Sequence, residues 1–242
     1  MLKRNVFSTA VIVLSLFFLL PNNAFSFGIG IYSPVFGTGS GDGTLSFDDF
    51  DDETDFDFES DHGGIIGIVL DTRVARRGTF NYRLHLGVER GDNDYMVDDG
   101  AFNRYVLDNT FGFGVVQTRV VRVWLGPQLR LAAISHTDDE NDYTFEVSGV
   151  EFGLAPVLGV NVNIGRVMTI AAELGYRFSG LAGSWEYSYS DFEYDYSNTG
   201  TFSMSERTFF INLAVIFRVG DVFDSGYEDV DDEKPDYDQD YY

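Results

Sequence analysis

Residues 80–90 alternate strictly between apolar and polar or small side chains, and this alternation is what most constrains the fold. The apolar members are Phe80, Tyr82, Leu84, Leu86 and Val88. Every residue between them is polar, charged or glycine. Because side chains of a β-strand point alternately to its two faces, the run predicts a strand with one apolar and one strongly polar face.

The same alternation recurs along the chain and predicts eight strands. Their expected ranges are 27–36, 64–74, 79–90, 104–116, 121–135, 145–162, 167–182 and 206–219. Such regularly spaced strands indicate an all-β domain of about 190 residues. The 26 Gly, 14 Tyr and 23 Phe of the chain suit tight turns and aromatic-rich strands.

The connections between these strands alternate in length. The long ones span 37–63, 91–103, 136–144 and 183–205, and the short ones span 75–78, 117–120 and 163–166. The long connections together carry 22 acidic residues. Barrels of bacterial outer membranes have long external loops and short periplasmic turns, so the pattern predicts an up-and-down antiparallel β-barrel with acidic external loops.

Residues 1–26 have the features of a secretory signal peptide. Lys3 and Arg4 form a basic start, residues 6–20 are largely apolar, and Ala24 and Ser26 are small residues at the positions that a signal peptidase reads. The chain contains no Cys, which excludes both a lipid-modified cysteine and a disulfide framework. We therefore expect an exported barrel at residues 27–219.

The charge of the exported chain limits its partners. Removal of residues 1–26 leaves 14 basic and 39 acidic residues, which argues against binding to nucleic acid. No apolar run after residue 26 has the length of a membrane helix, so a membrane span requires a closed barrel without free sheet edges. The prediction is an eight-stranded transmembrane β-barrel in the bacterial outer membrane. Residues 220–242, ten of them acidic, are expected to form a disordered periplasmic tail.

Three motifs resemble the small outer-membrane β-barrel family typified by OmpA and OmpX. They are the Leu-Gly-Tyr-Arg-Phe run at 174–178, the Gly-Pro-Gln-Leu-Arg-Leu run at 126–131 and the closing strand at 209–217. The resemblance covers about residues 27–219 and implies outer-membrane lipid and lipopolysaccharide as partners. It also implies the barrel-assembly machinery and periplasmic chaperones during biogenesis, and a monomeric protein. Members of this family often end on an aromatic residue, whereas here Phe217 is followed by the acidic tail, which is too short for a peptidoglycan-binding domain.

The polar face of the strands is expected to line the barrel interior. The candidate interior residues are Asp71, Arg73, Arg83, His85, Glu89, Asp108, Gln128, Arg130, Glu151, Glu173, Arg177, Asn212 and Arg218. An eight-stranded barrel is just wide enough for side chains to fill it, and charges confined there must pair. The leading interpretation is an interior closed by ion pairs, and the alternative is a narrow channel lined by Arg and Glu.

Catalysis was considered because some small outer-membrane barrels are hydrolases. Ser135 and His136 with the acidic residues that follow have the residue types of a hydrolytic triad. Adjacent residues of a strand point to opposite faces, however, which works against a hydrogen bond between them. His85 is expected to pack in the interior, and His62 is expected to end an acidic loop. No residue is assigned a catalytic role.

Two loop segments have unusual compositions. The acidic run 48–61 has oxygen ligands of the kind that Ca²⁺ prefers, but no window supplies both the Gly and the Glu that an EF-hand requires. No metal or cofactor site is therefore assigned. The run 185–196 interleaves aromatic and polar residues, which fits either a recognition surface or a hairpin that projects beyond the membrane.

The sequence as a whole predicts a non-enzymatic outer-membrane barrel with a filled interior and a structural or surface-interaction role. Three alternatives remain: a narrow channel, an outer-membrane hydrolase, and a soluble secreted barrel that binds a small ligand inside. The soluble barrel requires the opposite arrangement, with apolar side chains inside and charged side chains outside.

Overall fold

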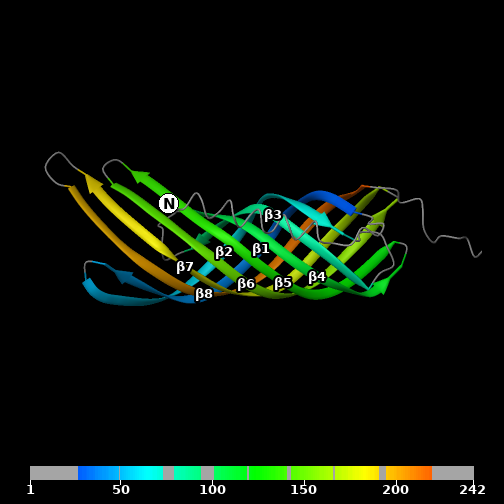
Figure 1. The fold of residues 1–242 in the computed structure, drawn as a ribbon, viewed down its shortest axis with the longest axis horizontal. Helices are drawn as coiled ribbons and strands as arrows, with labels where there is room; N and C mark the ends of the chain where they lie inside the picture. The colour runs from blue at the N-terminus through cyan, green and yellow to red at the C-terminus, as the bar shows by residue number, and fades with distance from the viewer. Residues whose placement is uncertain are drawn as a thin grey trace, which may run out of the picture.

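The computed structural model describes residues 27–48, 50–72, 79–93, 101–118, 120–140, 143–165, 167–190 and 195–219. It contains eight β-strands (Figure 1). They are β1 (Phe27–Phe47), β2 (Phe50–Asp71), β3 (Phe80–Asn93), β4 (Ala101–Gln117), β5 (Val121–Glu140), β6 (Tyr143–Ile164), β7 (Met168–Ser190) and β8 (Asp195–Val219). The expected signal peptide at 1–26 and the expected tail at 220–242 lie outside the described residues.

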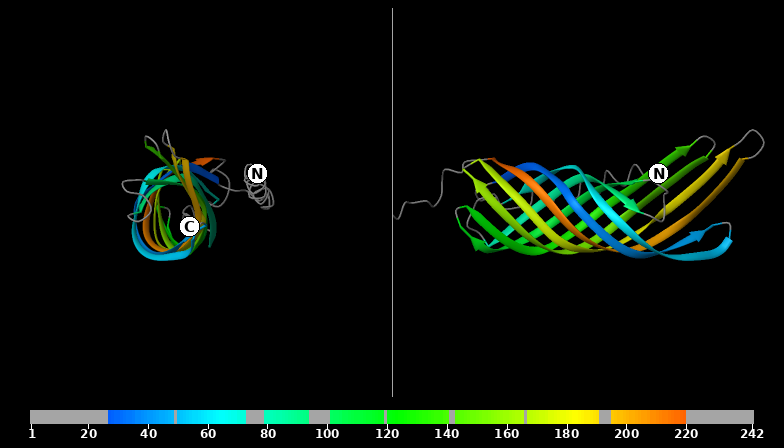
Figure 2. Two further views of the ribbon diagram at one scale, coloured as in Figure 1. Left: turned by 90° about the vertical axis from the view of Figure 1, so that its left-hand side faces the viewer. Right: turned by 180° about the vertical axis from the view of Figure 1, so that it is seen from behind.

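The strands form a closed antiparallel barrel in chain order, with β8 paired to β1 (Figure 2). The closing ladder begins with Phe27 opposite Val219 and continues to Phe47 opposite Gly200. The predicted eight-stranded up-and-down barrel is confirmed. Among the described residues no helix is long and apolar enough to cross a bilayer.

Five of the eight strands, β1, β2, β5, β7 and β8, extend well past the ranges expected from the sequence. β1 and β2 continue through most of 37–63 and are joined at residues 48–49, so the longest expected loop is largely a two-stranded ladder. β5, β6, β7 and β8 likewise absorb most of 136–144 and 183–205. The expected strand bounds are therefore too short at these ends, and the expected connections there are mostly strand. The reason is that the outer face beyond the apolar band is polar, while the apolar side chains, such as Phe56 and Phe58, face inward. The projecting hairpin expected around 185–196 is present as the ends of β7 and β8, with residues 191–194 outside the described part.

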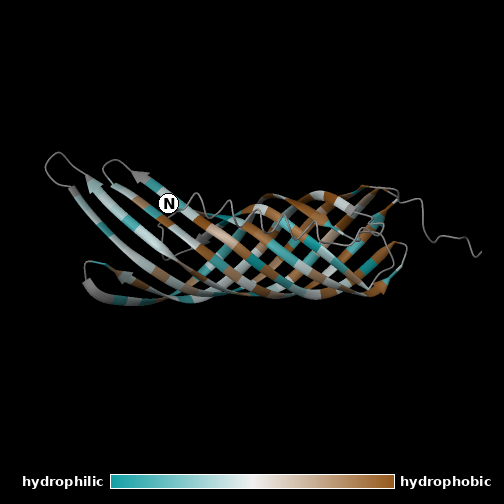
Figure 3. Ribbon diagram, viewed as in Figure 1, coloured by the Kyte–Doolittle hydropathy of each residue, from teal (hydrophilic) through white to brown (hydrophobic). Residues whose placement is uncertain are grey.

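Apolar side chains cover the outer face over roughly half of the barrel length. This half contains the start of β1 and the end of β8, and it is the more hydrophobic half of the ribbon in Figure 3. Exposed examples are Ile31, Leu125, Phe152, Phe178 and Phe217, each between 46% and 53% exposed. We call this region the apolar band, and the part of the strands beyond it the projecting wall.

Charged side chains from the same strands point inward. Arg83, Arg130 and Arg177 are at most 3% exposed, whereas Leu174 on the outer face is 39% exposed. This is the reverse of a soluble ligand-binding barrel, and that alternative is wrong for the strands described.

One outward-facing residue of the alternation is nevertheless covered. Leu84 is buried, although it shares its face of β3 with the exposed Leu86. The reason is local: the Tyr82 hydroxyl donates a 2.6 Å hydrogen bond to Oδ1 of Asn109, which is the cross-strand partner of Leu84. The Tyr82 side chain therefore leans along the wall towards Leu84.

Candidate functional site

The barrel interior contains three layers in which one arginine contacts two carboxylates. Among the described residues, five arginines and six Asp or Glu side chains are buried. Their identities follow from the strand period, because each lies at an inward position between outward-facing neighbours. The three layers succeed one another from the apolar band towards the projecting wall.

The proximal layer consists of Arg83, Asp71 and Glu173. Nη2 of Arg83 lies 2.6 Å from Oδ2 of Asp71, and Nη1 lies 2.7 Å from Oε1 of Glu173. The same guanidinium donates a 2.9 Å hydrogen bond to Oδ1 of Asn161. His85 is also present, with Nε2 3.8 Å from Oε1 of Glu173. All these side chains are almost fully buried, so the layer seals this end of the interior.

The middle layer consists of Arg130, Glu89 and Asp108. The guanidinium of Arg130 donates two hydrogen bonds of 2.7 Å to Asp108 and two of 2.6 Å to Glu89. Such paired contacts to planar carboxylates are the strongest geometry available to arginine. Arg177 faces this layer and lies over the Phe210 ring at 4.5 Å, and no carboxylate among the described residues lies within 4 Å of it.

The distal layer consists of Arg104, Glu151 and Glu206, with His62 and Ser60 beside them. Nη2 of Arg104 lies 3.2 Å from Oε2 of Glu206, and Nε lies 3.7 Å from Oε2 of Glu151. Nε2 of His62 lies 2.6 Å from Oε1 of Glu206, and Ser60 also donates to this oxygen. His62 is therefore an interior residue of β2, and its expected place at the end of a loop is wrong.

Each layer thus pairs one arginine with two acids and has a second basic residue nearby. That residue is His85 in the proximal layer, Arg177 in the middle layer and His62 in the distal layer. Among the described residues the interior holds five buried arginines and six buried Asp or Glu side chains, so its formal charges nearly cancel, as a filled lumen requires.

The pKa of Glu206 is set by water-side surroundings and by its interior partners, because this residue lies in the projecting wall. Its outward neighbours Ser205 and Arg207 are polar, which places it beyond the apolar band. Burial alone would raise the pKa of Glu206, but the charge of Arg104 and the hydrogen bonds from His62 and Ser60 outweigh burial. The pKa of this carboxyl therefore lies well below its ordinary value.

An apolar plug follows the distal layer inside the projecting wall. Its buried members are Phe56, Phe58, Phe102, Ile134, Val147, Trp185, Phe202 and Met204. The positions of β1 directly opposite Phe58 and Phe56 are Gly41 and Gly43. A Cβ at Gly41 would lie 2.5 Å from Cζ of Phe58, so only glycine leaves room for this ring.

The interior histidine does not have the arrangement of a hydrolytic triad. In a triad the serine and the acid contact different ring nitrogens, whereas Ser60 and Glu206 both approach Nε2 of His62. The other nitrogen, Nδ1, faces the Arg104 guanidinium, which can only donate. The network therefore assigns the proton to Nε2, and that nitrogen cannot accept a proton from Ser60.

Ser135 and His136, which have the residue types of a triad, are not brought together either. Ser135 is on the outer face of β5 and His136 is partly buried on the inner face, where its ring packs against Phe102 at 5.5 Å. His85 packs against the Tyr32 ring at 4.4 Å. Among the described residues no group of three His, Asp or Glu side chains has the geometry to hold a metal ion.

The expected interior residues are placed as follows. Eleven of them are buried, namely Asp71, Arg83, His85, Glu89, Asp108, Gln128, Arg130, Glu151, Glu173, Arg177 and Asn212. Arg218 is partly exposed and donates a 3.0 Å hydrogen bond to Oγ1 of Thr169. Arg73 lies outside the described residues. The sequence reasoning missed Arg104 and Glu206, which are the first residues of the expected strands 104–116 and 206–219, and it missed His62, which lies just before the expected strand 64–74. The signal was the period-two alternation of β4, β8 and β2.

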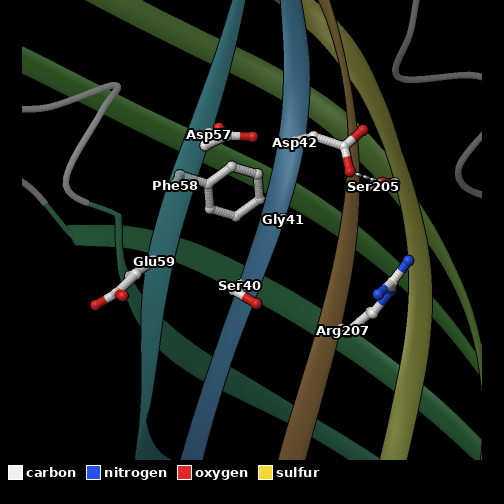
Figure 4. Close-up of a pocket in the computed structure, with 8 residues that line it drawn as sticks. All are labelled: Ser40, Gly41, Asp42, Asp57, Phe58, Glu59, Ser205 and Arg207. Carbon is white, nitrogen blue, oxygen red and sulfur yellow. Dashed lines mark hydrogen bonds between the residues drawn. The ribbon is translucent and has the colours of Figure 1, made fainter.

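The outer face of the projecting wall has a shallow depression of about 510 Å³ across β8, β1 and β2 (Figure 4). Three acids, Asp42, Asp57 and Glu59, share it with Arg207. Ser205 donates a 3.0 Å hydrogen bond to Oδ1 of Asp42. Acidic and basic groups are thus present together, and the depression does not select a ligand of one charge.

Comparisons with known proteins give structural neighbours only. No protein-family model matches the chain, and no curated protein matches it. The fold is similar to the outer membrane protein OprG from Pseudomonas aeruginosa, with a TM-score of 0.45 and 10% identity over 78% of this chain and 96% of that one. It is similar to Neisserial surface protein A, with a TM-score of 0.34 and 15% identity over 76% of this chain and 98% of that one. It is also similar to outer membrane protein AlkL, with a TM-score of 0.43 and 10% identity over 84% of this chain and 95% of that one.

Proposed function

We propose that this chain is a non-enzymatic β-barrel of a bacterial outer membrane with a closed interior and a structural or surface-interaction role. The observation that carries the proposal is the inside-out distribution of side chains. Arginine–carboxylate layers fill the axis while Leu, Ile, Val and Phe cover the outer wall. Lipid tolerates such a wall only when every backbone group is paired, and a closed barrel provides this pairing.

The proposed partners follow from this location. Outer-membrane lipid would contact the apolar band, and lipopolysaccharide would surround the base of the projecting wall. Assembly would require periplasmic chaperones and the barrel-assembly machinery, with residues 1–26 as a cleaved signal. A monomer is proposed, because the barrel satisfies its own edges by pairing β1 with β8.

Membrane residence is tested by folding the chain into lipid vesicles. A barrel of this kind should migrate faster on a detergent gel before heating than after heating. It should also stay with the vesicles after washing with alkaline carbonate. A chain that remains folded and monomeric in buffer without detergent or lipid would contradict the proposal.

A narrow channel is the second candidate, and one observation favours it. Several buried polar atoms between the middle and distal layers have no hydrogen-bond partner among the described residues. They include Nε of Arg177, both carboxylate oxygens of Glu151, and the hydroxyls of Ser179 and Thr208. Buried polar groups of this kind are normally satisfied by water, so this part of the axis would be hydrated.

Planar-bilayer recording separates the two functions. A lumen closed by three ion layers and the apolar plug should give no sustained current steps. Reproducible steps from the purified chain, abolished by a bulky substitution such as Ser179→Trp beside Arg177, would establish the channel and reject the closed interior. An outward-facing change, Gly180→Trp, is the matched control and should leave any current unaltered.

A further inference from the structure

The projecting wall is an open sheet, because two of the eight strands stop early. Among the described residues, pairing between β2 and β3 ends with Ser60 opposite Asn93, and pairing between β4 and β5 ends with Asn103 opposite Ser135. The other six strands continue towards the tip past the ends of β3 and β4 (Figure 2). β3 ends in Gly-Asp-Asn, residues that disfavour strands. Beyond this level β2 is therefore an edge strand.

The edge of β2 between residues 50 and 59 has backbone groups that no strand of the described residues pairs. On its other side this segment is paired to β1, from Phe47 opposite Phe50 to Ser40 opposite Glu59. The N–H and C=O groups of successive strand residues point alternately to the two sides, so about half of them point away from β1. Such a row of backbone donors and acceptors is a template for a further strand. We call this segment the free edge.

The connection that follows β3 is too short to cover the whole free edge. Seven residues, 94–100, join Asn93 to Ala101 on the neighbouring strand. With at most about 3.6 Å per residue, such a connection can rise about 14 Å beside β2 before it must return. The free edge is about 30 Å long at the rise of a strand. Its half nearer the tip, residues 50–55, is therefore beyond the reach of this connection.

The outer face of the free edge carries charge of one sign. Glu53, Asp55, Asp57 and Glu59 are successive outward residues, and all are exposed. Asp55 accepts a 2.9 Å hydrogen bond from Oγ1 of Thr44, and no ion pair joins any of the four to a described Lys or Arg. The row disfavours a second copy of this edge as the partner, because acids would then lie opposite acids. It attracts a strand that presents Lys or Arg.

The inner side of the free edge is apolar. Phe56 and Phe58 are inward residues of β2 and belong to the apolar plug. Leu45 and Phe47 of β1 pack against the plug and are only partly buried, so the apolar layer is incompletely covered towards the tip. A strand added beside β2 would place every second side chain against this layer. The two faces of the edge thus favour a partner that is basic on one face and apolar on the other.

We propose that the free edge binds an extended peptide segment of another protein in which basic residues alternate with apolar ones. The segment would add to the sheet as a further strand, with main-chain hydrogen bonds to β2, basic side chains beside the acidic row and apolar side chains over the plug. This inference deepens the surface-interaction role proposed above, and it rests on that proposal for placing the projecting wall in water. The two can fail separately, because membrane insertion is measured before any peptide is added.

The test uses the full chain in nanodiscs of phosphatidylcholine, a lipid without net charge that does not attract a basic probe. The probe is a fluorescent peptide of four Lys-Val repeats, and its anisotropy at physiological salt measures binding. A peptide of four Glu-Val repeats should bind at least about tenfold more weakly, because like charges would face each other. A Lys-Val peptide that is N-methylated at two adjacent central residues keeps its charge but loses a donor on each side. It should also bind at least about tenfold more weakly.

Charge variants decide whether the free edge is the site. Glu53→Gln with Asp55→Asn should weaken binding of the Lys-Val peptide by about fivefold or more. Glu146→Gln with Glu186→Gln removes the same charge from exposed, directly opposed positions of β6 and β7 and should leave the affinity unchanged. Equal weakening by the two pairs would overturn the proposal, because it would show nonspecific attraction to an acidic wall. So would equal affinity for the N-methylated peptide, or no binding at millimolar peptide.

Cross-linking locates the peptide independently of charge. The chain contains no Cys, so Thr54→Cys introduces a single thiol on the face of β2 that carries Phe56. A peptide with Cys in place of one central Val should form a disulfide there, because facing residues of paired strands have Cβ atoms close enough for one. Ser184→Cys, exposed on the outer face of β7, is the control and should not be cross-linked. Equal cross-linking at the two positions would contradict an added strand at the free edge.

Discussion

Replacing Arg130 by methionine tests whether the ion layers hold the barrel together. Arg130 is 1% exposed and makes four hydrogen bonds of 2.6–2.7 Å to Glu89 and Asp108. Removing one member of a buried pair typically costs about 3–5 kcal/mol, because the partner charge is left without compensation. Here two carboxylates lose their partner, so a cost near the upper end, about 5 kcal/mol, is expected. That corresponds to roughly three and a half orders of magnitude in the folding equilibrium.

The assay is reversible urea unfolding in lipid vesicles, followed by tryptophan fluorescence. With a denaturant slope of about 2 kcal/mol per molar, the midpoint should fall by about 2.5 M. Arg90→Met on the same strand is the matched control, because Arg90 is exposed, and it should cost less than about 0.5 kcal/mol. Adding Glu89→Gln and Asp108→Asn to the Arg130 variant should restore much of the loss by removing the stranded charges. Equal midpoints for the Arg130 and Arg90 variants would refute the reasoning.

Three further changes probe the wall and the distal layer. Gly159→Val should destabilise the barrel by about 1–3 kcal/mol in the same urea assay, because a Cβ there would lie 2.0 Å from the Trp124 ring. Gly180→Val is the control, because a Cβ at Gly180 meets open space and should be tolerated. Equal costs for the two variants would contradict this packing. Because the pKa of Glu206 is lowered in the folded state, its ionised form contributes fully to folding stability above its ordinary pKa of 4.5. That contribution is lost as the pH falls towards the lower, folded-state pKa. Glu206→Gln should therefore flatten the acid side of a profile of stability against pH, and an unaltered profile would argue against the pairing. Tyr82→Phe removes one hydrogen bond between strands and should cost about 1 kcal/mol by the same midpoint measurement, and a larger cost would indicate a packing defect instead.

The alternation of apolar and charged residues was sufficient to predict the barrel and most of its interior. In β3 the inward position of Arg83, His85 and Glu89 followed directly from the strand period. The pairing partners could not be predicted, because a one-residue shift between strands would exchange them. The contact of Arg130 with both Glu89 and Asp108 depends on the register of three strands at once.

Apart from the hairpin expected around 185–196, the projecting wall was not predicted, because its outer face contacts water and not lipid. A strand in lipid must show an apolar outer face, whereas a strand in water can carry Ser, Thr, Asp or Glu there. In β1 beyond Phe36 the outward residues are polar and the inward ones are mostly glycine, so neither face shows the apolar period. Ser60 and His62 of the distal layer lie in such an extension, on β2, which is why they escaped the sequence analysis.

The pairing of Phe27 with Val219 has a consequence for how the molecule is made. The ladder that completes the cylinder joins segments separated by nearly the whole described chain, a contact that is slow to find because of the large loop it closes. Until β8 is available for pairing, β1 has no neighbour on one side and offers an open template to other unfolded chains. A chain whose synthesis stops before residue 195 would therefore keep an unpaired edge of β1 and be prone to aggregation, and quality-control proteases would have to remove it.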